Sequence, residues 1–463
     1  MPLNFSKRNI LVLGAGVTGS AIAQSLHRRG AEVAIADDRK MENSSFKTLL
    51  SDDVDISEWE SVVVSPGWKS SHPLIQKFLA AGADITNEID LAWQIKQEEV
   101  PHQKWFAITG TNGKTTTVEM TAAAMRAGGI NAIACGNVGD TVIDAVENRD
   151  KFDVLVLELS SFQIHWMKFA QFTASAILNI ADDHTDWHGT FEEYARTKIS
   201  LLDSSSTGIL NADDGEVVQR CSQWKGRKVF FSLDTPGPGE IGVVEELLVD
   251  RAFVADPQEA AMICELTEIK PTVPHNVSNA LAAAGLARAA GVNHEDIRSA
   301  LSTFTPGRHR IEQVLEHSGV TWIDDSKATN PHAATASIMS ALSVVWIAGG
   351  LAKGAQMDEL IKRCSKRIKA AVLIGEDKDL IADAINEHAP HIAVIKIDKP
   401  LSYQIGSPDN SLMEDVVEAA RGFAIEGDTV LLAPACASMD LFTNYADRGD
   451  RFAAAVKKVI LGE

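Results

Sequence analysis

Short apolar runs alternate along the whole chain with segments of good helix formers, and glycine-containing turns lie between them. The runs at residues 9–13, 106–108 and 153–158 are almost continuously apolar, which is typical of parallel strands that are buried on both faces of a sheet. The intervening segments are long enough, and rich enough in strong helix formers, to predict helices. This alternation predicts an α/β fold in which mainly parallel sheets are flanked by helices.

The predicted strands fall into three groups, and each group has the pattern of a separate domain. They lie at 9–13, 32–36 and 61–65; at 106–108, 153–158 and 174–179; and at 312–315, 320–323, 344–348, 371–374, 392–397 and 429–432. A polar segment at 97–103, which contains Pro101, predicts a linker, and Thr305-Pro-Gly307 ends the second group. We therefore expect three domains, at 1–101, 102–305 and 306–463.

The most informative turn follows the strand at 106–108. There Gly110-Thr-Asn-Gly113 leads into Lys114, Thr115 and a helix over 118–126. Unpaired backbone N–H groups and the helix dipole make such a turn a site for phosphate, with the lysine on the terminal phosphates and the hydroxyl on Mg²⁺. The spacing differs from the usual phosphate loop because Ile108 holds the place of its first glycine, and a plain glycine-rich turn is the alternative. The prediction is an ATP site.

A second glycine loop lies near the N-terminus. Gly14-Ala-Gly16-Val-Thr-Gly19 follows a strand and opens a helix through residue 29, and the next strand ends at Asp37-Asp38-Arg39. This is a dinucleotide-type fingerprint, in which the acidic residue holds a ribose. NAD is one candidate ligand. A nucleotide diphosphate on a sugar offers the same groups, and glycines that only pack the helix against the strand are the third possibility.

Two groups of side chains suggest a metal ion. Glu158 ends a predicted strand beside the phosphate loop, where nucleotide-hydrolysing enzymes place a metal ligand, although it could also cap a helix. His184 and His188 stand among three aspartates, at a spacing that could form a zinc pair on one helix face. Because no third zinc ligand is evident and residues 187–189 look like a loop, we favour one histidine assisting Mg²⁺.

Composition narrows the class of protein. The net charge of −20 disfavours a long basic track for nucleic acid. No apolar run approaches the roughly 20 residues of a membrane span, and the N-terminus lacks the apolar core of a signal peptide. Five scattered cysteines without a C-x-x-C pair fit neither a disulfide framework nor a zinc site. We expect a cytoplasmic protein that binds neither nucleic acid nor membrane.

With these residues in view, the chain resembles the Mur ligase family of cell-wall synthesis over essentially its whole length. The motifs that carry the resemblance are Thr109-Gly-Thr-Asn-Gly-Lys-Thr-Thr, Glu158-Leu-Ser-Ser-Phe-Gln163, the stretch 179–184, His275-Asn276, His309-Arg310 and Asp325-Ser-Lys327. The stretches 325–330 and 434–438 and the first glycine loop are similar to the branch that adds D-glutamate. Motifs expected of the branches that add L-alanine or a diamino acid are absent.

The resemblance implies a Rossmann-like first domain, a P-loop ATPase-like second domain and a Rossmann-like third domain that binds the amino acid. It implies an ATP-dependent, ADP-forming ligase that joins D-glutamate to UDP-N-acetylmuramoyl-L-alanine through an acyl phosphate, in cytoplasmic peptidoglycan synthesis. Two Mg²⁺ ions are implied, together with a carbamylated lysine at Lys198, which composition alone would leave on the surface. We expect a monomer.

The resemblance also implies roles for individual residues. Lys114, His184 and Lys198 would be catalytic, and the metal ligands would be Thr115, Glu158, His184 and Lys198. ATP would be bound by Gly110, Thr111, Asn112, Gly113, Lys114, Thr115, Thr116, Asn276, Arg310, Asp325 and Lys327. The UDP-sugar would be bound by Thr18, Asp37, Arg39, Gly67 and Asn137, and D-glutamate by Thr329, Lys353, Ser438 and Tyr445. The alternative for Lys353 is a surface loop lysine.

Three other functions stay open on the sequence. A folylpolyglutamate synthase shares the ATP core and also adds glutamate, but lacks a first domain with this glycine loop. A dehydrogenase would bind NAD at Gly14 to Gly19. A non-enzymatic module would bind ATP and release no phosphate with any acceptor.

Overall fold

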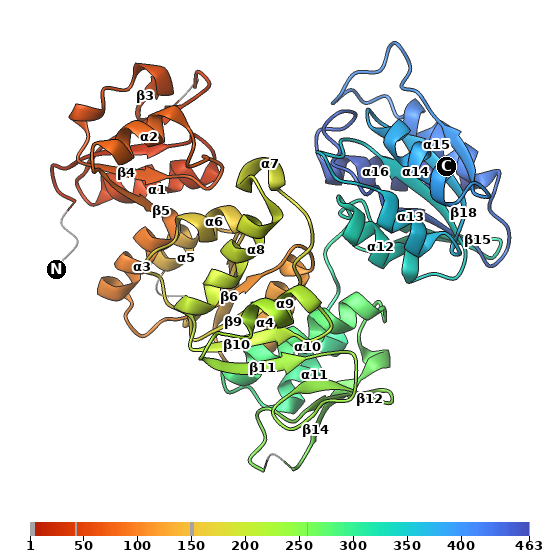
Figure 1. Cartoon of the computed structure of the whole chain (residues 1–463), viewed down its shortest axis with the longest axis horizontal. Helices are drawn as coiled ribbons and strands as arrows, with labels where there is room; N and C mark the ends of the chain where they lie inside the picture. The colour runs from red at the N-terminus through yellow and green to blue at the C-terminus, as the bar shows by residue number, and fades with distance from the viewer. Residues whose placement is uncertain (1–4, 42–43, 149–151, 257, 463) are drawn as a thin grey trace. The chain divides into compact units, whose positions relative to one another are not determined.

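The computed structural model describes residues 5–41, 44–148, 152–256 and 258–462. Within these ranges the strands form three sheets, of five, nine and six strands, each flanked by helices (Figure 1). The predicted three-domain α/β architecture with mainly parallel sheets is therefore confirmed. The chain divides into two compact units: the first two sheets belong to one, and the third sheet belongs to the other.

The N-terminal sheet is entirely parallel, with the order β3-β2-β1-β4-β5. Its elements are β1 Asn9–Leu13, α1 Val17–Arg28, β2 Glu32–Asp37, β3 Lys47–Leu50, β4 Ser61–Val64, α2 Pro73–Ala80, β5 Asp84–Asn87 and α3 Glu88–Glu99. Because β1 lies between β2 and β4, the chain leaves it at the point where the strand order reverses, and ligands of open α/β sheets bind at such points. The two edge strands, β3 and β5, were not predicted, since each has only four residues of mixed polarity.

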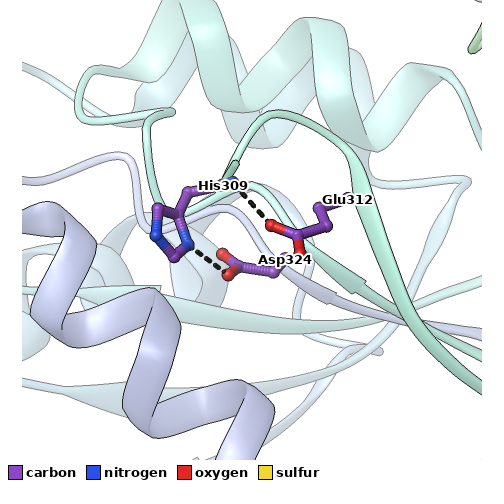
Figure 2. A group of neighbouring side chains, drawn as sticks. All are labelled: His309, Glu312 and Asp324. Carbon is purple, nitrogen blue, oxygen red and sulfur yellow. Dashed lines mark hydrogen bonds and ion pairs between the residues drawn. The ribbon is translucent and has the colours of Figure 1, made fainter. Parts of the chain in front are cut away.

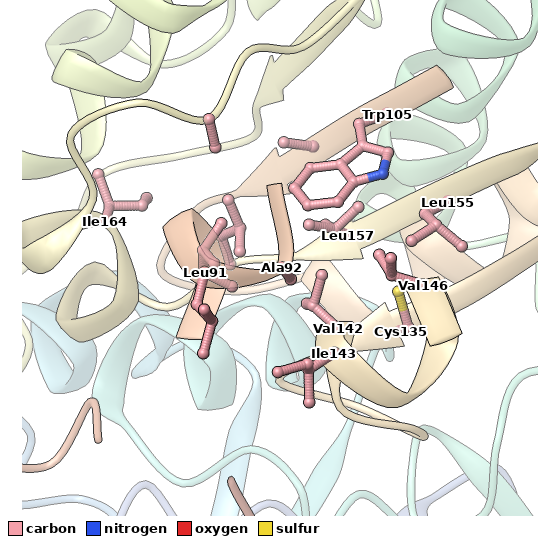
Figure 3. Close-up of a cluster of buried hydrophobic side chains, with 14 of the residues drawn as sticks. Leu91, Ala92, Trp105, Cys135, Val142, Ile143, Val146, Leu155, Leu157 and Ile164 are labelled. Atoms are coloured by element: carbon pink, nitrogen blue, oxygen red, sulfur yellow. The ribbon is translucent and has the colours of Figure 1, made fainter. Parts of the chain in front are cut away.

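The segment at 97–103, where the sequence predicts a linker, consists of the last residues of α3 and a short turn that precedes the second sheet. Helix α3 continues to Glu99, and Gln103 is buried and accepts a hydrogen bond from the Trp105 indole (2.9 Å). Figure 3 shows Leu91 and Ala92 of α3 packed with Trp105 and with side chains of the neighbouring elements. The apolar face of α3 therefore belongs to the core of the second sheet, and the helix ends before Pro101.

The central sheet has the order β14-β13-β12-β11-β10-β9-β6-β8-β7. Its strands are β6 Lys104–Thr109, β7 Ala132–Gly136, β8 Val154–Glu158, β9 Ala174–Ile177, β10 Thr207–Asn211, β11 Arg227–Phe231, β12 Ile241–Val244, β13 Leu247–Asp250 and β14 Ala261–Glu265. Its helices are α4 Lys114–Ala127, α5 Val142–Glu147, α6 Ser161–Trp166, α7 Thr185–His188, α8 Phe191–Ile199, α9 Gly215–Cys221, α10 Pro274–Ala289 and α11 His294–Thr303. The last three strands form an antiparallel extension at one edge.

Strand β6 is buried on both faces, as its continuous apolar run predicts. Trp105 and Ala107 point into one core, with α3 and α5, while Phe106 and Ile108 point into the other, with α4 and α10. This double burial fixes the height at which β6 ends. The loop that follows it is therefore held rigidly at the carboxyl edge of the sheet.

The third sheet has the order β15-β16-β20-β17-β18-β19. Its strands are β15 Glu312–His317, β16 Val320–Asp324, β17 Val344–Gly349, β18 Ile368–Ile374, β19 Ala393–Lys396 and β20 Thr429–Leu432, and its helices are α12 Pro331–Met339, α13 Asp358–Cys364, α14 Lys378–His388, α15 Ser411–Arg421 and α16 Tyr445–Val456. Only the β15–β16 hairpin is antiparallel. The carboxyl ends of β16, β20 and β17 are therefore neighbours.

All five cysteines are buried free thiols. Burial raises the pKa of the Cys264 and Cys436 thiols to about 12, so both are protonated at neutral pH. No helix in the described ranges combines the length and the apolar character needed to cross a lipid bilayer.

Candidate active site

The loop after β6 is built as the sequence predicts. Gly113 ends it with a left-handed φ of 85°, and a Cβ there would lie 2.4 Å from the Asn279 side chain, so only glycine fits. The Asn179 carboxamide accepts from Asn112 N (2.8 Å) and donates to Asn112 O (3.1 Å). A residue at the end of β9 thus fixes the loop backbone while its remaining N–H groups lead into α4. This arrangement is that of a phosphate-binding helix N-terminus.

Lys114 and its neighbours open helix α4 directly after the loop. The Lys114 ammonium donates to the carbonyls of Gly110 (2.9 Å) and Thr111 (3.0 Å), so its charge lies over the loop. Thr115 is half-buried and Thr116 is buried in the first turn of the helix. Hydroxyls and positive charge therefore converge where the sequence predicts the terminal phosphates of ATP.

Lys198 is not the surface lysine that composition alone suggests. It lies on α8 with only 2% of its area exposed, and its ammonium donates to Gly110 O at 2.8 Å. The same ammonium lies 4.7 Å from the centre of the Tyr194 ring, whose hydroxyl hydrogen-bonds the Thr111 hydroxyl (2.9 Å). Helix α8 therefore places the Lys198 ammonium beside Gly110, the first residue of the phosphate loop.

Glu158 ends β8 beside that loop, because β8 pairs with β6 and Glu158 stands opposite Ile108. Its Oε1 accepts from the Asn137 side chain at 2.9 Å. Its Oε2 is buried and has no hydrogen-bond partner among the described residues. A buried carboxylate oxygen without a donor is costly unless a cation faces it. Glu158 therefore fits the role of a metal ligand better than that of a helix cap, which Ser160 fills instead.

The two histidines of the aspartate-rich stretch have different surroundings. Residues 185–188, of which 187 and 188 were expected in a loop, form the single helical turn α7. His188 hydrogen-bonds the Ser161 hydroxyl (2.9 Å) through Nε2. His184 precedes the turn with a strained φ of 55°, its backbone N–H bonded to the Asp183 carboxylate, and it belongs to the second compact unit. Non-glycine residues in this conformation cluster at functional sites.

Asn276 lies in the first turn of α10 and is buried. Its carboxamide donates to the carbonyls of Lys270 (3.2 Å) and Pro271 (3.0 Å). The side chain is therefore oriented by the segment that precedes its own helix.

The predicted UDP-sugar residues of the first sheet gather at its carboxyl edge. Asp37 accepts from Ala15 N (2.8 Å) and Arg39 N (3.2 Å), so this carboxylate holds the glycine loop. Thr18 is half-buried in the first turn of α1, and Gly67 follows β4. Asn137 is placed elsewhere, after β7 of the central sheet, where it bonds Glu158.

Four predicted residues lie close together at the carboxyl edge of the third sheet. Burial raises the pKa of Asp325 to about 6, although hydrogen bonds from Ser337 and from Ile311 N oppose the shift. The Lys327 ammonium lies 4.1 Å from the centre of the Tyr445 ring. Arg310 is half-buried directly before Ile311. The Asp325–Lys327 turn and the start of α16 thus form one surface.

The remaining predicted residues of this edge differ in exposure. Ser438 is 4% exposed and its carbonyl accepts from Phe442 N (2.8 Å), while Thr329 is half-buried. Lys353 is exposed and has a left-handed φ of 52°. Its ammonium thus extends from a strained backbone position after β17.

Sequence reasoning missed Arg448, whose guanidinium is completely buried at the same edge. It donates to the hydroxyl and carbonyl of Ser326 (both 2.9 Å), to Cys436 O (3.2 Å) and to Gly349 O (3.4 Å). One side chain therefore ties together the three loops that follow β16, β20 and β17. The signal was present: Arg448 stands four residues before Phe452 and eight before Val456, on the apolar stripe of α16.

His309, Glu312 and Asp324 form a compact cluster below this edge. Figure 2 shows the His309 ring bonded to Asp324 (2.7 Å) and the His309 backbone N–H bonded to Glu312 (2.9 Å). The three could each offer one metal-ligating atom within 4.8 Å of one another. Their polar atoms already bond one another. We therefore interpret the cluster as one that stabilises the strained turn at His309, whose φ is 65°.

Phosphate loops of this kind, rigidly mounted beside a carboxylate, belong to enzymes that use nucleoside triphosphates. Three family models match the chain: "Mur ligase MurD-like, N-terminal domain" at residues 8–87, "Mur ligase middle domain" at 108–287, and "Mur ligase, glutamate ligase domain" at 309–436. The chain belongs to the Mur ligase family.

Relatives within the family are similar over their full length. The chain is 44% identical to the UDP-N-acetylmuramoylalanine--D-glutamate ligase of Streptomyces coelicolor, covering 99% of this chain and 100% of that protein. It is also 44% identical to the ligase of that name from Thermobifida fusca, over 97% and 98%. In fold it is similar to the MurF ligase of Thermotoga maritima in complex with ADP, with a TM-score of 0.59, 16% identity and 100% of both chains covered.

Proposed function

We propose that this chain is an ATP-dependent, ADP-forming ligase that joins D-glutamate to UDP-N-acetylmuramoyl-L-alanine in the cytoplasmic synthesis of peptidoglycan precursors. The observation that carries the proposal is the full-length similarity to ligases of that name, together with a phosphate loop whose backbone, Lys114 and Lys198 are all held in place. The proposed bounds of the UDP-sugar, ATP and amino-acid domains are 1–101, 102–305 and 306–463. The proposed state is a monomer.

The chemistry proceeds in two steps. A terminal carboxylate oxygen of the muramoyl-alanine attacks the γ-phosphorus of ATP, the bond to the bridging oxygen breaks, and ADP leaves. The amine of D-glutamate then adds to the acyl-phosphate carbonyl, loses a proton, and expels inorganic phosphate to leave an amide. Both steps depend on alignment and on neutralising phosphate charge more than on covalent participation by the protein.

The chain's own residues supply that alignment. The loop from Gly110 to Thr116 and the Lys114 ammonium receive the β- and γ-phosphates, and Asn276, Arg310, Asp325 and Lys327 contact the rest of ATP. Asp37, Arg39 and Thr18 hold the UDP part, with Gly67 and Asn137 on the sugar side. Thr329, Lys353, Ser438 and Tyr445 receive D-glutamate. The buried Arg448 keeps the loops of this last group together.

Two Mg²⁺ ions fit the donor set. Thr115 and Glu158 would hold one, and the unpaired Glu158 Oε2 supports this. His184 and a carbamate on Lys198 would hold the other; the burial of Lys198 supports the carbamate, since burial favours the neutral amine, which is the form that can be carbamylated. When bound, the ions neutralise charge on the transferring phosphoryl group.

The test is release of inorganic phosphate with ATP, UDP-N-acetylmuramoyl-L-alanine and a panel of D- and L-amino acids. Release that requires the UDP-sugar together with D-glutamate is expected, and Lys114→Ala should abolish it and weaken ATP binding. Release with a folate acceptor would indicate a folylpolyglutamate synthase. A change in NADH fluorescence on mixing would indicate a dehydrogenase, and ATP binding without phosphate release would indicate a binding module.

A further inference from the structure

Two tryptophans of the central domain donate hydrogen bonds to consecutive carbonyls of one loop in the N-terminal domain. The Trp166 indole N–H, at the end of α6, bonds the Trp68 carbonyl at 3.1 Å. The Trp187 indole N–H, in α7, bonds the Gly67 carbonyl at 3.2 Å. The two domains lie in one compact unit, and these bonds join helices of the central domain to a loop of the N-terminal domain. Together they fix the height and the direction of the loop after β4.

This loop is part of the glycine-loop site. A Cβ on Gly14 would lie 2.7 Å from the Ser65 hydroxyl and 3.2 Å from the Trp68 indole nitrogen, so the loop packs directly on the first glycine turn. The Ser65 hydroxyl is buried and has no hydrogen-bond partner among the described residues. Any shift of this loop would therefore move the groups that line the site for the UDP-sugar.

The two tryptophan side chains are themselves packed against other aromatic rings. The Trp187 ring lies 4.7 Å from the Phe162 ring and 5.0 Å from the His165 ring, between centroids. His188, beside it, stacks on Phe162 and bonds the Ser161 hydroxyl. Trp166 is 8% exposed and packs edge-on against His165. The indole N–H groups therefore have little freedom to follow the loop if it moves.

We propose that Trp166 and Trp187 are positioning residues that hold the UDP-sugar loop of the N-terminal domain in register with the phosphate loop. The inference rests on the proposed ligase function, in which a carboxylate carried by the UDP-sugar must meet the γ-phosphate bound in the central domain. A misplacement of about 1 Å can cost roughly 100-fold in such a reaction, so a two-point attachment between the domains has a direct use.

The test uses substitutions that remove the N–H donors together with the five-membered ring of each indole. Trp166→Phe, Trp187→Phe and the double variant keep an aromatic ring at each position. Trp224→Phe is the matched control, because Trp224 packs on Gly208 and Gly226 at β10 and β11 of the same domain. For each variant the KM for UDP-N-acetylmuramoyl-L-alanine, ATP and D-glutamate, the kcat and the melting temperature are measured.

The double variant should raise the KM for the UDP-sugar by about 5- to 30-fold, as expected for two neutral hydrogen bonds, and should lower kcat. The KM values for ATP and D-glutamate should stay within about twofold of wild type. A merely structural role would move all three KM values together and follow the melting temperature, and either that result or an unchanged KM for the UDP-sugar would overturn the inference. If the wild type itself releases no phosphate with these substrates, the ligase function fails instead.

Discussion

At the scale of single residues, two buried cations stand beside the residues predicted to form the sites. Lys198 and Arg448 are both buried: the Lys198 ammonium donates to Gly110 O, and the Arg448 guanidinium donates to Ser326, Cys436 O and Gly349 O. Burial lowers the pKa of Arg448 to about 10, which still leaves it charged at neutral pH. Taking a cation out of water is expensive unless hydrogen bonds or opposite charges replace its hydration. We infer that both are retained for what they position.

Lys198→Ala should remove most of the phosphate release while ATP still binds, because the lost group serves the phosphoryl transfer and not the nucleotide. If Lys198 acts as a carbamate, a small added carboxylate such as acetate should restore part of the activity. Lys198→Arg is the matched variant: it keeps the positive charge but cannot form the lysine carbamate, and it should stay inactive. Full activity in either variant would show that a carbamate on Lys198 is not needed for phosphate release.

Lys353→Ala tests the amino-acid pocket. D-glutamate brings two carboxylates, and truncating one side of a charge pair that becomes buried costs about 2–5 kcal/mol, which is about 30-fold or more. The KM for D-glutamate should rise by that order, with the KM for ATP and for the UDP-sugar little changed. Lys366→Ala, an exposed lysine before β18 at the opposite edge of the sheet, is the control. An unchanged KM would leave Lys353 as a surface loop lysine.

At the scale of elements, one buried network fixes the antiparallel extension of the central sheet to its helices. Asp250, at the end of β13, accepts from His294 of α11 (2.9 Å) and from Arg288 of α10 (3.0 Å). Burial by itself would raise the pKa of Asp250, but hydrogen bonds from His294, Phe253 N, Ala252 N and Arg288 together hold it below its ordinary value. The folded state therefore favours the ionised carboxylate.

Asp250→Asn should destabilise the central domain by about 3–5 kcal/mol, because Arg288 is left without its counter-charge. Glu268→Gln is the control: Glu268 pairs with Arg298 of α11 and is more exposed than Asp250. Its loss should cost less than about 1 kcal/mol. Since the pKa is depressed, the wild-type contribution is present above about pH 4 and is lost as the pH falls through the folded pKa. Hydrogen exchange of the β13 amides measures both effects, and equal protection in the two variants would contradict the prediction.

At the scale of the whole chain, three carboxylates fasten the N-terminal domain to the central domain. Glu88 at the start of α3 accepts from Ile143 N of α5 at 3.2 Å. Asp90, two residues further, accepts from the backbone N–H groups of 168–170, and Glu147 of α5 pairs with Arg29. These contacts and the tryptophan pair connect the same two domains. The glycine loop is therefore part of a body that also carries the phosphate loop.

Glu88 makes that junction sensitive to pH. Burial raises its pKa to about 7, against the opposing hydrogen bonds from Ile143 N and Val142 N. A raised carboxyl pKa means that the folded state binds the proton more tightly, so stability should fall as the pH rises from about 4.5 to about 7 and then stay level. Glu88→Gln should remove this slope and melt at a higher temperature than wild type at about pH 8. Glu98→Gln, exposed on the same helix, should keep the slope; its loss there would contradict the assignment.

The sequence by itself determined the parts whose signals are local. The continuous apolar runs at β1, β6 and β8 predicted parallel strands, because a strand buried on both faces has no polar positions. The glycine loops at Gly14 and Gly113 predicted nucleotide sites, because the turn needs a residue without a side chain and the next helix supplies free N–H groups. The family resemblance was readable for the same reason: its motifs are the turns at strand ends.

Only the tertiary structure decided the features that join distant segments. Lys198 is buried because α8 packs against the phosphate loop, which lies almost ninety residues earlier in the chain. The role of Arg448 depends on three strands whose carboxyl ends are neighbours. Helix α3, which runs into the expected linker, packs into a core that is formed mostly by distant segments of the chain. Hydrogen bonds of the kind that Trp166 and Trp187 donate leave no periodic pattern, because their acceptors are backbone carbonyls, which every residue has.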